Sequence, residues 1–347
     1  MTEREDADIL NANNYTESAD TRGPEWGISM KNTVVLLPLS EEKKQALRER
    51  FPACSFRFVP EKELTAELAG EAEILIGFPK PALIGASERL EFLQLSSSGA
   101  DAYVKPGVLA PGTLLASVTG AYGQAVGEHA FAMTWELLKK LHLYRDDQAR
   151  AIWGDRGTVG TLRGATVLVV GLGDIGSEYA RLCKAVGAHV IGVKRRPSAC
   201  PDCVDELGLT DDLDRYLPRA DVVCTVLPGT DKTYHLFNAA RFAAMKPGSI
   251  FLNCGRGTAF DADALVEALQ KGPLAAAGSD VTEVEPLPAS HPLWKQENMV
   301  ITPHISGGFH LPGTLERIEE ICFANLEAFL GGGEIRNVID FSTGYKK

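Results

Sequence analysis

Short apolar runs alternate with amphipathic or charged segments along most of the chain. In the N-terminal third, apolar runs predict strands at 34–37, 55–59, 73–77 and 92–96, and a charged helix is predicted at 41–50. A longer helix is expected to begin near Glu128, because apolar residues recur at three- and four-residue steps as far as Tyr144. Alternation of this kind favours parallel βα units, with helices covering both faces of a sheet.

A second series of the same kind begins at Thr166. Its strands are predicted at 167–170, 189–193, 221–227, 249–253, 275–281 and 299–303. The helix after the first of these strands is expected to have one apolar side, formed by Ile175, Tyr179, Leu182 and Val186. A final amphipathic helix is predicted at 314–330, and the glycines at 331–333 end it. The two series predict two α/β domains, with the last helix returning to the first.

The overall composition narrows the possible classes of function. At 347 residues the chain is long enough for about two domains, and 35 Lys and Arg against 46 Asp and Glu give a net charge of −11. An acidic chain without a long basic run is a poor candidate for binding nucleic acid or an anionic membrane. No apolar run approaches the roughly 18 residues that a membrane span needs.

The N-terminus and the cysteines indicate where the protein works. Residues 1–29 are polar and acidic and lack the basic start and apolar stretch of a secretory signal, so they predict a solvated leader. Seven cysteines scattered through apolar segments predict reduced thiols in a cytoplasmic protein. Cys200 and Cys203 lack the second pair of ligands that a structural zinc site needs, so we expect a surface loop there and no metal.

The first motif with chemistry is a glycine-rich turn directly after the apolar strand at 167–170. Gly171 permits a tight turn, Gly173 lets a pyrophosphate approach the backbone, and Gly176 lets the next helix pack closely on the strand. The N-terminus of that helix presents free N–H groups and the positive end of the helix dipole. We therefore predict a dinucleotide site, with contacts at Gly171, Gly173, Asp174, Ile175 and Gly176.

The end of the next strand indicates which dinucleotide binds. An acidic residue there would accept hydrogen bonds from the adenosine ribose and repel a 2′-phosphate. The sequence instead has Lys194, Arg195 and Arg196. Three cations favour a 2′-phosphate through charge-assisted hydrogen bonds, so we predict NADP in preference to NAD. A solvated basic turn is the alternative interpretation.

Reactive residues follow the ends of three later strands, in the segments 253–257, 280–286 and 302–308. In an open parallel sheet, the carboxyl ends of the strands border the ligand crevice. Arg256 could hold a carboxylate and polarise a neighbouring carbonyl, and His304 could donate a proton to the carbonyl oxygen. Glu285 beside that histidine would raise its pKa and keep it protonated near neutral pH. Together these residues predict a site that reduces a carbonyl compound.

These motifs resemble those of the D-isomer-specific 2-hydroxyacid dehydrogenases, and the resemblance covers nearly everything from Val34 to Val338. The family's N-x-A-R-G segment is matched by Asn253, Gly255, Arg256 and Gly257. Its D-V-x-x-x-E-P segment is matched by Asp280, Val281, Glu285 and Pro286. Its T-P-H-I-G-G segment is matched by Thr302, Pro303, His304 and Ile305, with Ser306 inserted before Gly307.

The resemblance implies a role for each of these residues. Arg256 would bind the carboxylate and carbonyl of the substrate, His304 would be the general acid/base, and Glu285 would orient and charge that histidine. Asp280 matches a family residue that contacts the nicotinamide end of the cofactor. Further cofactor contacts are expected at Leu227, Pro228, Cys254, Gly255, Arg256, His304 and Gly307.

The family also implies a fold of two doubly wound parallel sheets, in which a Rossmann cofactor domain is inserted into a flavodoxin-like substrate domain. The substrate domain would comprise 30–128 and 311–347, and the Rossmann domain 129–310. The substrate would lie in the cleft between them, which closes by hinge motion.

Two loops carry the remaining implications of the resemblance. The segment 95–101 is similar to the family's glycine loop, whose backbone N–H groups hold the substrate carboxylate, so Ser98 and Gly99 are candidate substrate contacts. The segment 126–130 is similar to the start of the interdomain helix. That helix commonly lies in the dimer interface of the family, so we expect a homodimer.

Three residues depart from the family pattern. Lys194 replaces the usual ribose-binding acid, Tyr122 replaces a frequent asparagine, and Cys254 replaces a small residue. The leading hypothesis is an NADP-preferring enzyme that reversibly reduces a small 2-oxo acid to its (R)-2-hydroxy acid. A dinucleotide-sensing protein like the family's transcriptional corepressors is the alternative from another class. A phosphoglycerate or formate dehydrogenase is the alternative within the enzyme class.

Overall fold

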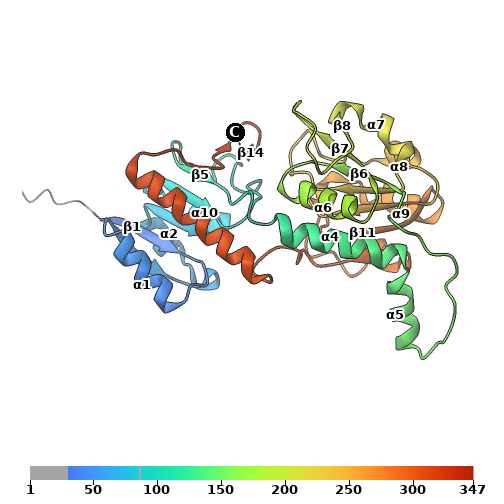
Figure 1. Cartoon of the computed structure of the whole chain (residues 1–347). Helices are drawn as coiled ribbons and strands as arrows, with labels where there is room; N and C mark the ends of the chain where they lie inside the picture. Colours follow the sequence, from blue (N-terminus) through green and yellow to red (C-terminus); the bar gives the residue numbers. More distant parts are fainter. Residues whose placement is uncertain (1–29, 86, 347) are drawn as a thin grey trace, which may run out of the picture.

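Two lobes, each built on a parallel sheet, make up the protein (Figure 1). The computed structural model describes residues 30–85 and 87–346, so the predicted leader at 1–29 lies outside the described residues. The sheets have five and seven strands, and the strand pairs within both are parallel. This arrangement confirms the predicted fold class of two doubly wound α/β domains.

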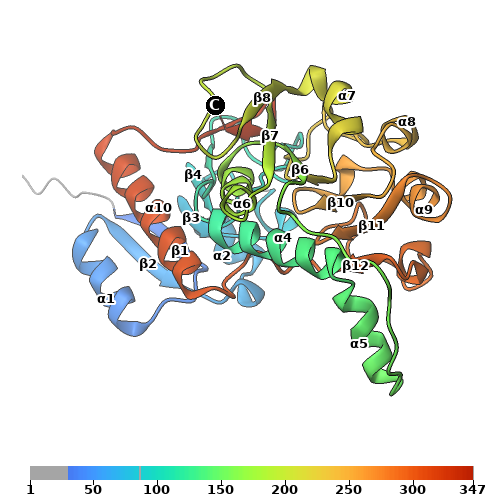
Figure 2. The same ribbon diagram turned by 45° about the vertical axis from the view of Figure 1, so that its right-hand side comes forward.

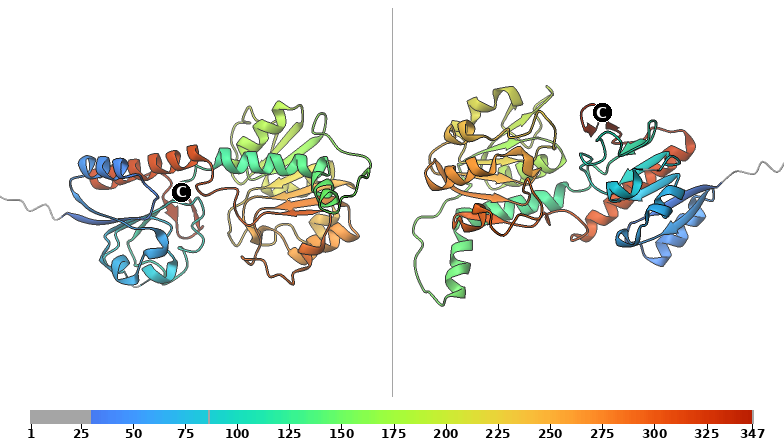
Figure 3. Two further views of the ribbon diagram at one scale, coloured as in Figure 1. Left: turned by 90° about the horizontal axis from the view of Figure 1, so that it is seen from below. Right: turned by 180° about the vertical axis from the view of Figure 1, so that it is seen from behind.

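The first lobe contains the five-stranded sheet, in the flavodoxin-like order β2-β1-β3-β4-β5. Its strands are β1 (Lys31–Val35), β2 (Cys54–Phe58), β3 (Ile74–Gly77), β4 (Phe92–Leu95) and β5 (Leu114–Ala116). Its connecting helices are α1 (Glu41–Arg50), α2 (Ala66–Glu71) and α3 (Pro81–Ile84). The long helix α10 (Pro312–Gly331) packs on the same sheet (Figure 3), since Ile318 and Cys322 share a core with Ile76 and Phe92. The last helix therefore returns to the first lobe, as predicted.

The second lobe contains the seven-stranded sheet, in the order β12-β11-β10-β9-β6-β7-β8 (Figure 2). From β8 inward this is the Rossmann order 3-2-1-4-5-6, with β12 added at the far edge. Its strands are β6 (Thr166–Val170), β7 (His189–Lys194), β8 (Glu206–Leu209), β9 (Val222–Thr225), β10 (Ser249–Asn253), β11 (Leu274–Ser279) and β12 (Met299–Ile301). The second lobe is inserted in the chain between β5 and α10.

Helices cover both faces of the second sheet. The helices α6 (Asp174–Ala185) and α4 (Gly123–Leu138) share one core on the first face, which includes Met133 and Tyr179. A second core on the other face includes Phe242 and Leu265. The helices of that face are α7 (Leu213–Tyr216), α8 (Ala239–Ala243) and α9 (Ala262–Gln270). Short 3-10 turns complete the connections, at η1 (Glu61–Glu63), η2 (Thr210–Asp212), η3 (Leu217–Arg219), η4 (Gly257–Ala259) and η5 (Pro292–Lys295).

The helix predicted from Glu128 to Tyr144 is in fact two helices. Helix α4 begins at Gly123, because it continues N-terminally through small residues that pack against α6. Lys140 has a left-handed φ of 57°, so the chain turns there and Tyr144 lies on the separate helix α5 (Leu141–Ala149). Helix α5 and the loop after it project away from the second lobe in Figures 1 and 2. The predicted domain boundaries, at 128 and 310, stay predictions.

The buried side of α6 also differs from the prediction. Tyr179 is fully buried, as expected, but its buried neighbours on the helix are Gly176, Ala180 and Cys183. The predicted Ile175, Leu182 and Val186 are only partly buried. Small residues let α6 approach β6 and α4 closely, which displaces the longer side chains toward its flanks. The edge strands β5 and β8 were not predicted; in β8, Glu206 and Gly208 interrupt the apolar run that marks the central strands.

A short antiparallel hairpin follows α10. It pairs β13 (Ile339–Asp340) with β14 (Tyr345–Lys346), and Ile339 is buried in the core of the first lobe. Gly332 takes the left-handed φ of 69° at the end of α10, as the glycine run predicts. Among residues 30–85 and 87–346, no helix has the length and apolar character that crossing a membrane requires.

Candidate active site

The predicted glycine-rich turn joins β6 to α6 at the centre of the second sheet. Gly171 has a φ of 103°, a left-handed conformation that strains residues with a side chain. A Cβ at Gly176 would overlap the carbonyl oxygen of Gly171, so this glycine is needed for close packing of helix on strand. The turn lies at the carboxyl end of β6, where the sheet extends to β7 on one side and β9 on the other. This switch point suits a dinucleotide pyrophosphate.

A cleft of about 680 Å³ opens beside this turn and is lined by both lobes. We call it the interlobe cleft. The predicted residues that line it are Ser98, Gly99, Gly171, Gly173, Asp174, Ile175, Gly176, Leu227, Pro228, Cys254, Gly255 and Arg256. The structure therefore brings the predicted substrate loop and much of the predicted cofactor site to one place.

Arg256 lies on the loop after β10 and spans the cleft. Its Nε donates to Asp101 Oδ1 at 3.2 Å, and its Nη1 donates to the carbonyl of Gly255 at 3.0 Å. Its guanidinium lies so close to the 98–101 loop that a Cβ at Gly99 would overlap it. Asn253 holds the loop, since its side chain donates to the Arg256 carbonyl at 2.9 Å. A carboxylate bound against Gly99 would thus meet a guanidinium.

Glu285 and His304 form a direct ion pair. His304 Nδ1 and Glu285 Oε2 are 2.8 Å apart. The hydrogen bond with Glu285 raises the pKa of His304, although partial burial and the nearby Arg256 cation oppose the shift. Partial burial disfavours the charged form of Glu285, yet hydrogen bonds from His304 and from the Thr282 N–H hold the pKa of its carboxyl below the usual range. The pair thus favours an imidazolium beside a carboxylate.

Asp280 is buried and holds the loop that carries His304. Its Oδ1 accepts from Thr302 Oγ1 at 2.6 Å and from the Ile305 N–H at 3.0 Å. Its Oδ2 accepts from the Ser306 N–H at 3.1 Å. Both oxygens of the Asp280 carboxylate thus accept hydrogen bonds from residues 302–306 of the same chain. The predicted contact between Asp280 and the nicotinamide stays a prediction.

The other predicted cofactor residues lie outside the lining of the interlobe cleft. Lys194, at the end of β7, donates to Ser198 Oγ at 3.0 Å, and Arg195 and Arg196 are exposed. Gly307 faces the ring of Tyr122 near the start of α4. The residues that do not line the interlobe cleft itself are Lys194, Arg195, Arg196, Asp280, Glu285, His304 and Gly307.

Asp174, the first residue of α6, connects the glycine-rich turn to the start of α4, where the chain leaves the first lobe. Its carboxylate accepts the backbone N–H groups of Gly123 and Tyr122 at the start of α4. Burial raises the pKa of Asp174, while these two hydrogen bonds favour its charged form. The residue therefore lines the cleft and also ties α4 to α6.

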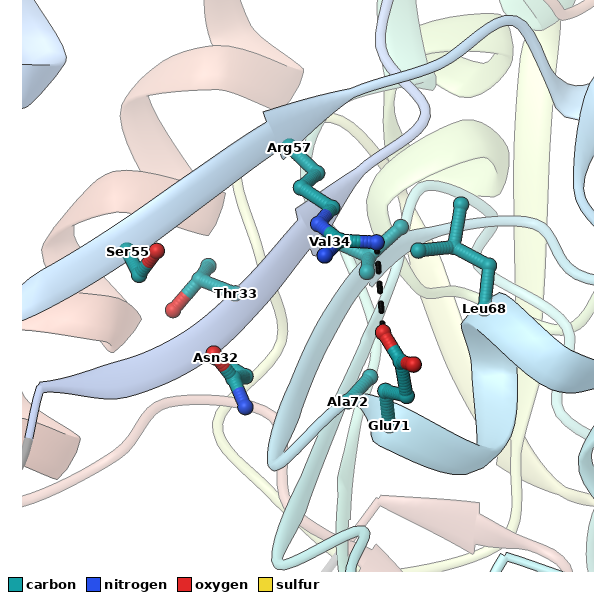
Figure 4. Close-up of a pocket in the computed structure, with 8 residues that line it drawn as sticks. All are labelled: Asn32, Thr33, Val34, Ser55, Arg57, Leu68, Glu71 and Ala72. Carbon is teal, nitrogen blue, oxygen red and sulfur yellow. Dashed lines mark ion pairs between the residues drawn. The ribbon is translucent and has the colours of Figure 1, made fainter.

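A second, smaller pocket lies on the first lobe, between β1, β2 and α2 (Figure 4). It is a hollow of about 190 Å³ that is open to solvent, and its two charged residues, Arg57 and Glu71, pair with each other at 3.2 Å. Within the described ranges, no cluster of three or more His, Cys, Asp or Glu could hold a metal, and Cys200 and Cys203 are free.

Comparison with known proteins assigns the family. The family model described as "D-isomer specific 2-hydroxyacid dehydrogenase, NAD binding domain" matches residues 131–306. Glyoxylate/hydroxypyruvate reductase B of Escherichia coli O17:K52:H18 (strain UMN026 / ExPEC) is 30% identical over 300 residues, which cover 81% of this chain and 90% of that protein. The chain belongs to the D-isomer-specific 2-hydroxyacid dehydrogenases.

Solved structures of this dehydrogenase family agree with the fold. A family member from Aeromonas salmonicida subsp. salmonicida A449 has a TM-score of 0.78 at 32% identity, covering 90% of this chain and 100% of that chain. The NADPH-dependent glyoxylate/hydroxypyruvate reductase from Sinorhizobium meliloti, solved with NADP and sulfate, has a TM-score of 0.74 at 25% identity, covering 91% and 100%. The protein is an NAD(P)-dependent dehydrogenase of 2-hydroxy acids.

Seven residues that line the interlobe cleft of this dehydrogenase were not predicted. They are Ala100, Asp101, Thr119, Val226, Gly229, Gly344 and Tyr345. Asp101 stands in the segment that resembles the family's glycine loop, so an acid opposite Arg256 could have been suspected from the sequence. Tyr345 follows a polar stretch near the C-terminus and carries no motif. Its place in the cleft depends on how the last residues cross between the lobes.

Proposed function

We propose that this dehydrogenase reduces small 2-oxo acids to (R)-2-hydroxy acids, with NADP as the preferred cofactor. The observation that best supports the proposal is the Glu285–His304 pair at 2.8 Å, with Arg256 close enough to affect the pKa of both partners. An acid/base with a carboxylate-binding cation nearby suits a substrate whose carbonyl adjoins its carboxylate.

Each residue of the site has a distinct task in this proposal. Arg256 and the backbone N–H groups near Ser98 and Gly99 hold the substrate carboxylate. A bound, reduced nicotinamide supplies the hydride that the carbonyl carbon accepts. His304 gives its proton to the carbonyl oxygen, and Glu285 keeps the histidine charged until that transfer. In the reverse direction, neutral His304 takes the hydroxyl proton.

The preference for NADP rests on the basic turn after β7. Arg195 and Arg196 are exposed there, and Lys194 hydrogen-bonds a neighbouring serine and not a carboxylate. Exposed cations are free to bind a 2′-phosphate. The Sinorhizobium meliloti relative is an NADPH-dependent enzyme, which supports the same choice.

The test follows oxidation of NADPH and of NADH with glyoxylate, hydroxypyruvate, pyruvate and a branched 2-oxo acid. We expect faster turnover with NADPH on at least one of these acids. In His304→Gln, kcat is expected to fall by about 100-fold or more while NADPH still binds. Unchanged turnover in that variant would refute the acid/base assignment. NADPH binding with no turnover on any acid would favour the sensing function.

We also infer that two copies of the chain form a homodimer. Helix α5 and the following loop project from the second lobe (Figure 1). The apolar side chains of Leu141, Ile152 and Trp153 are exposed there. Apolar groups gathered on a projection are suited to burial against a partner. Light scattering on the purified chain should give twice the monomer mass, and a monomer at micromolar concentration would contradict the inference. Cytoplasmic location stays a prediction.

A further inference from the structure

The hairpin β13–β14 begins in the first lobe and ends at the glycine-rich turn of the second. Its base is anchored, because Ile339 is buried in the first lobe's core and Val338 forms a β-bridge with Ala116. Its far end lines the interlobe cleft through Gly344 and Tyr345. Figure 1 shows β14 and the C-terminal end on the side of the first lobe that faces the second.

Tyr345 lies over the open side of Gly173. Its hydroxyl is 4.0 Å from the position that a Cβ on Gly173 would occupy, and no other heavy atom comes as close to that position. Within residues 30–85 and 87–346, no residue forms a hydrogen bond with this hydroxyl. Asp174 and Arg195 are both near enough to influence its ionisation. A polar group with no protein partner therefore points into the site at which a dinucleotide would approach the backbone.

The chemistry of a phenol suits this place. Burial raises the pKa of Tyr345, so the hydroxyl keeps its proton at neutral pH and can donate a hydrogen bond. Phosphate oxygens are acceptors without donors, and a hydrogen bond to a charged oxygen is stronger than one between neutral groups. The backbone of the glycine turn supplies donors from the second lobe, and Tyr345 adds one from the first.

We propose that Tyr345 is a further cofactor-binding residue, which donates a hydrogen bond to the pyrophosphate of the bound dinucleotide. The inference rests on the proposed function, since it requires that the cleft binds NADP or NAD. It also gives the β13–β14 hairpin a role in cofactor binding. A cofactor held by Gly173 on one side and Tyr345 on the other links the two lobes before the substrate enters.

The test compares the wild-type chain with Tyr345→Phe, which keeps the ring and removes the hydroxyl alone. Isothermal titration calorimetry without any oxo acid gives the Kd of NADPH, NADH and adenosine 2′-monophosphate. We expect NADPH and NADH to bind about tenfold more weakly, because both lose a hydrogen bond to a charged acceptor. Adenosine 2′-monophosphate lacks the pyrophosphate, so its Kd should not change.

A matched control is Tyr144→Phe. The Tyr144 hydroxyl lies on α5, outside the cleft, and accepts the backbone N–H of Arg156 in the loop that follows. The Kd values of this variant should equal those of the wild type. Unchanged or tighter binding of NADPH in Tyr345→Phe would overturn the inference. Weaker binding of adenosine 2′-monophosphate would place the contact at the adenosine end and overturn the pyrophosphate assignment. A wild-type chain that binds neither dinucleotide would overturn the proposed function, and this inference with it.

Discussion

Replacing Glu285 by glutamine would remove the charge that holds His304 protonated while keeping the size of the side chain. In the wild type, the hydrogen bond with Glu285 raises the pKa of His304 against partial burial and the Arg256 cation. Once the carboxylate is gone, burial and Arg256 dominate, and the pKa of His304 falls. The imidazolium that reduction requires is then scarcer at neutral pH.

The structure sets the size of the effect. A hydrogen bond to a charged group contributes about 1.5–3 kcal/mol. The side chains of His304 and Glu285 are 47% and 38% exposed, and solvent screening therefore favours the lower value, about 1.5 kcal/mol. This corresponds to a loss of about tenfold in kcat for 2-oxo acid reduction at neutral pH.

The sign of the pH dependence follows from the proton that His304 must carry. Reduction is at full rate below the pKa of His304 and is lost as the pH rises through it, so Glu285→Gln should shift this alkaline limb to lower pH. Oxidation of the hydroxy acid needs the neutral imidazole, and its acid limb should shift the same way. NADPH absorbance followed over a pH series measures both limbs.

A control from the same loop separates this effect from general disturbance. Glu283 bonds to His235 at 2.9 Å and to Tyr234 at 3.1 Å, not to His304. Glu283→Gln makes the same chemical change and should leave the alkaline limb in place. If the limb is at the same pH in Glu285→Gln and the wild type, then Glu285 does not set the charge of His304 and the reasoning is wrong.

Two further substitutions test the substrate and cofactor contacts. In Gly99→Ala, the new Cβ would overlap the Arg256 guanidinium and displace it, so kcat/KM for the oxo acid is expected to fall about 100-fold while calorimetry still detects NADPH binding. If kcat/KM is unchanged in Gly99→Ala, then turnover does not require Arg256 to lie against the 98–101 loop. Serine at all three positions of 194–196 should lower the NADPH-to-NADH ratio of kcat/KM by about tenfold or more, because charge-assisted bonds to the 2′-phosphate are lost. A ratio that stays constant in steady-state kinetics would show that this turn does not select the phosphate.

The parts of the fold that the sequence predicts best are those with a strong local pattern. The helix at 41–50 and the strand at 249–253 have the predicted bounds, since one is a charged segment after the capping residue Ser40 and the other is buried along its whole length. The glycine-rich turn has the predicted neighbours for the same reason. Buried parallel strands are continuous apolar runs, which stand out from the segments around them.

The parts that the sequence did not predict depend on tertiary contacts. The break at Lys140 is a single left-handed residue inside an amphipathic pattern, which periodicity cannot detect. The contact between Arg256 and Asp101 joins residues 155 positions apart and requires the two lobes to face each other. Tyr345 reaches Gly173 for the same reason. Such contacts follow from the placement of domains, which no local pattern contains.

The three segments that carry Arg256, Glu285 and His304 are linked by direct contacts between their loops. A Cβ at Gly257 would overlap the backbone of Thr282, so the loop of Arg256 lies against the loop of Glu285. Asp280, at the start of that second loop, accepts the backbone N–H groups of Ile305 and Ser306, the two residues that follow His304. These bonds hold His304 at a left-handed φ of 53°, a conformation that costs about 1–2 kcal/mol for a residue with a side chain. The buried carboxylate thereby sustains the strained backbone that turns the imidazole toward Glu285, and three motifs far apart in the chain depend on one another for their geometry.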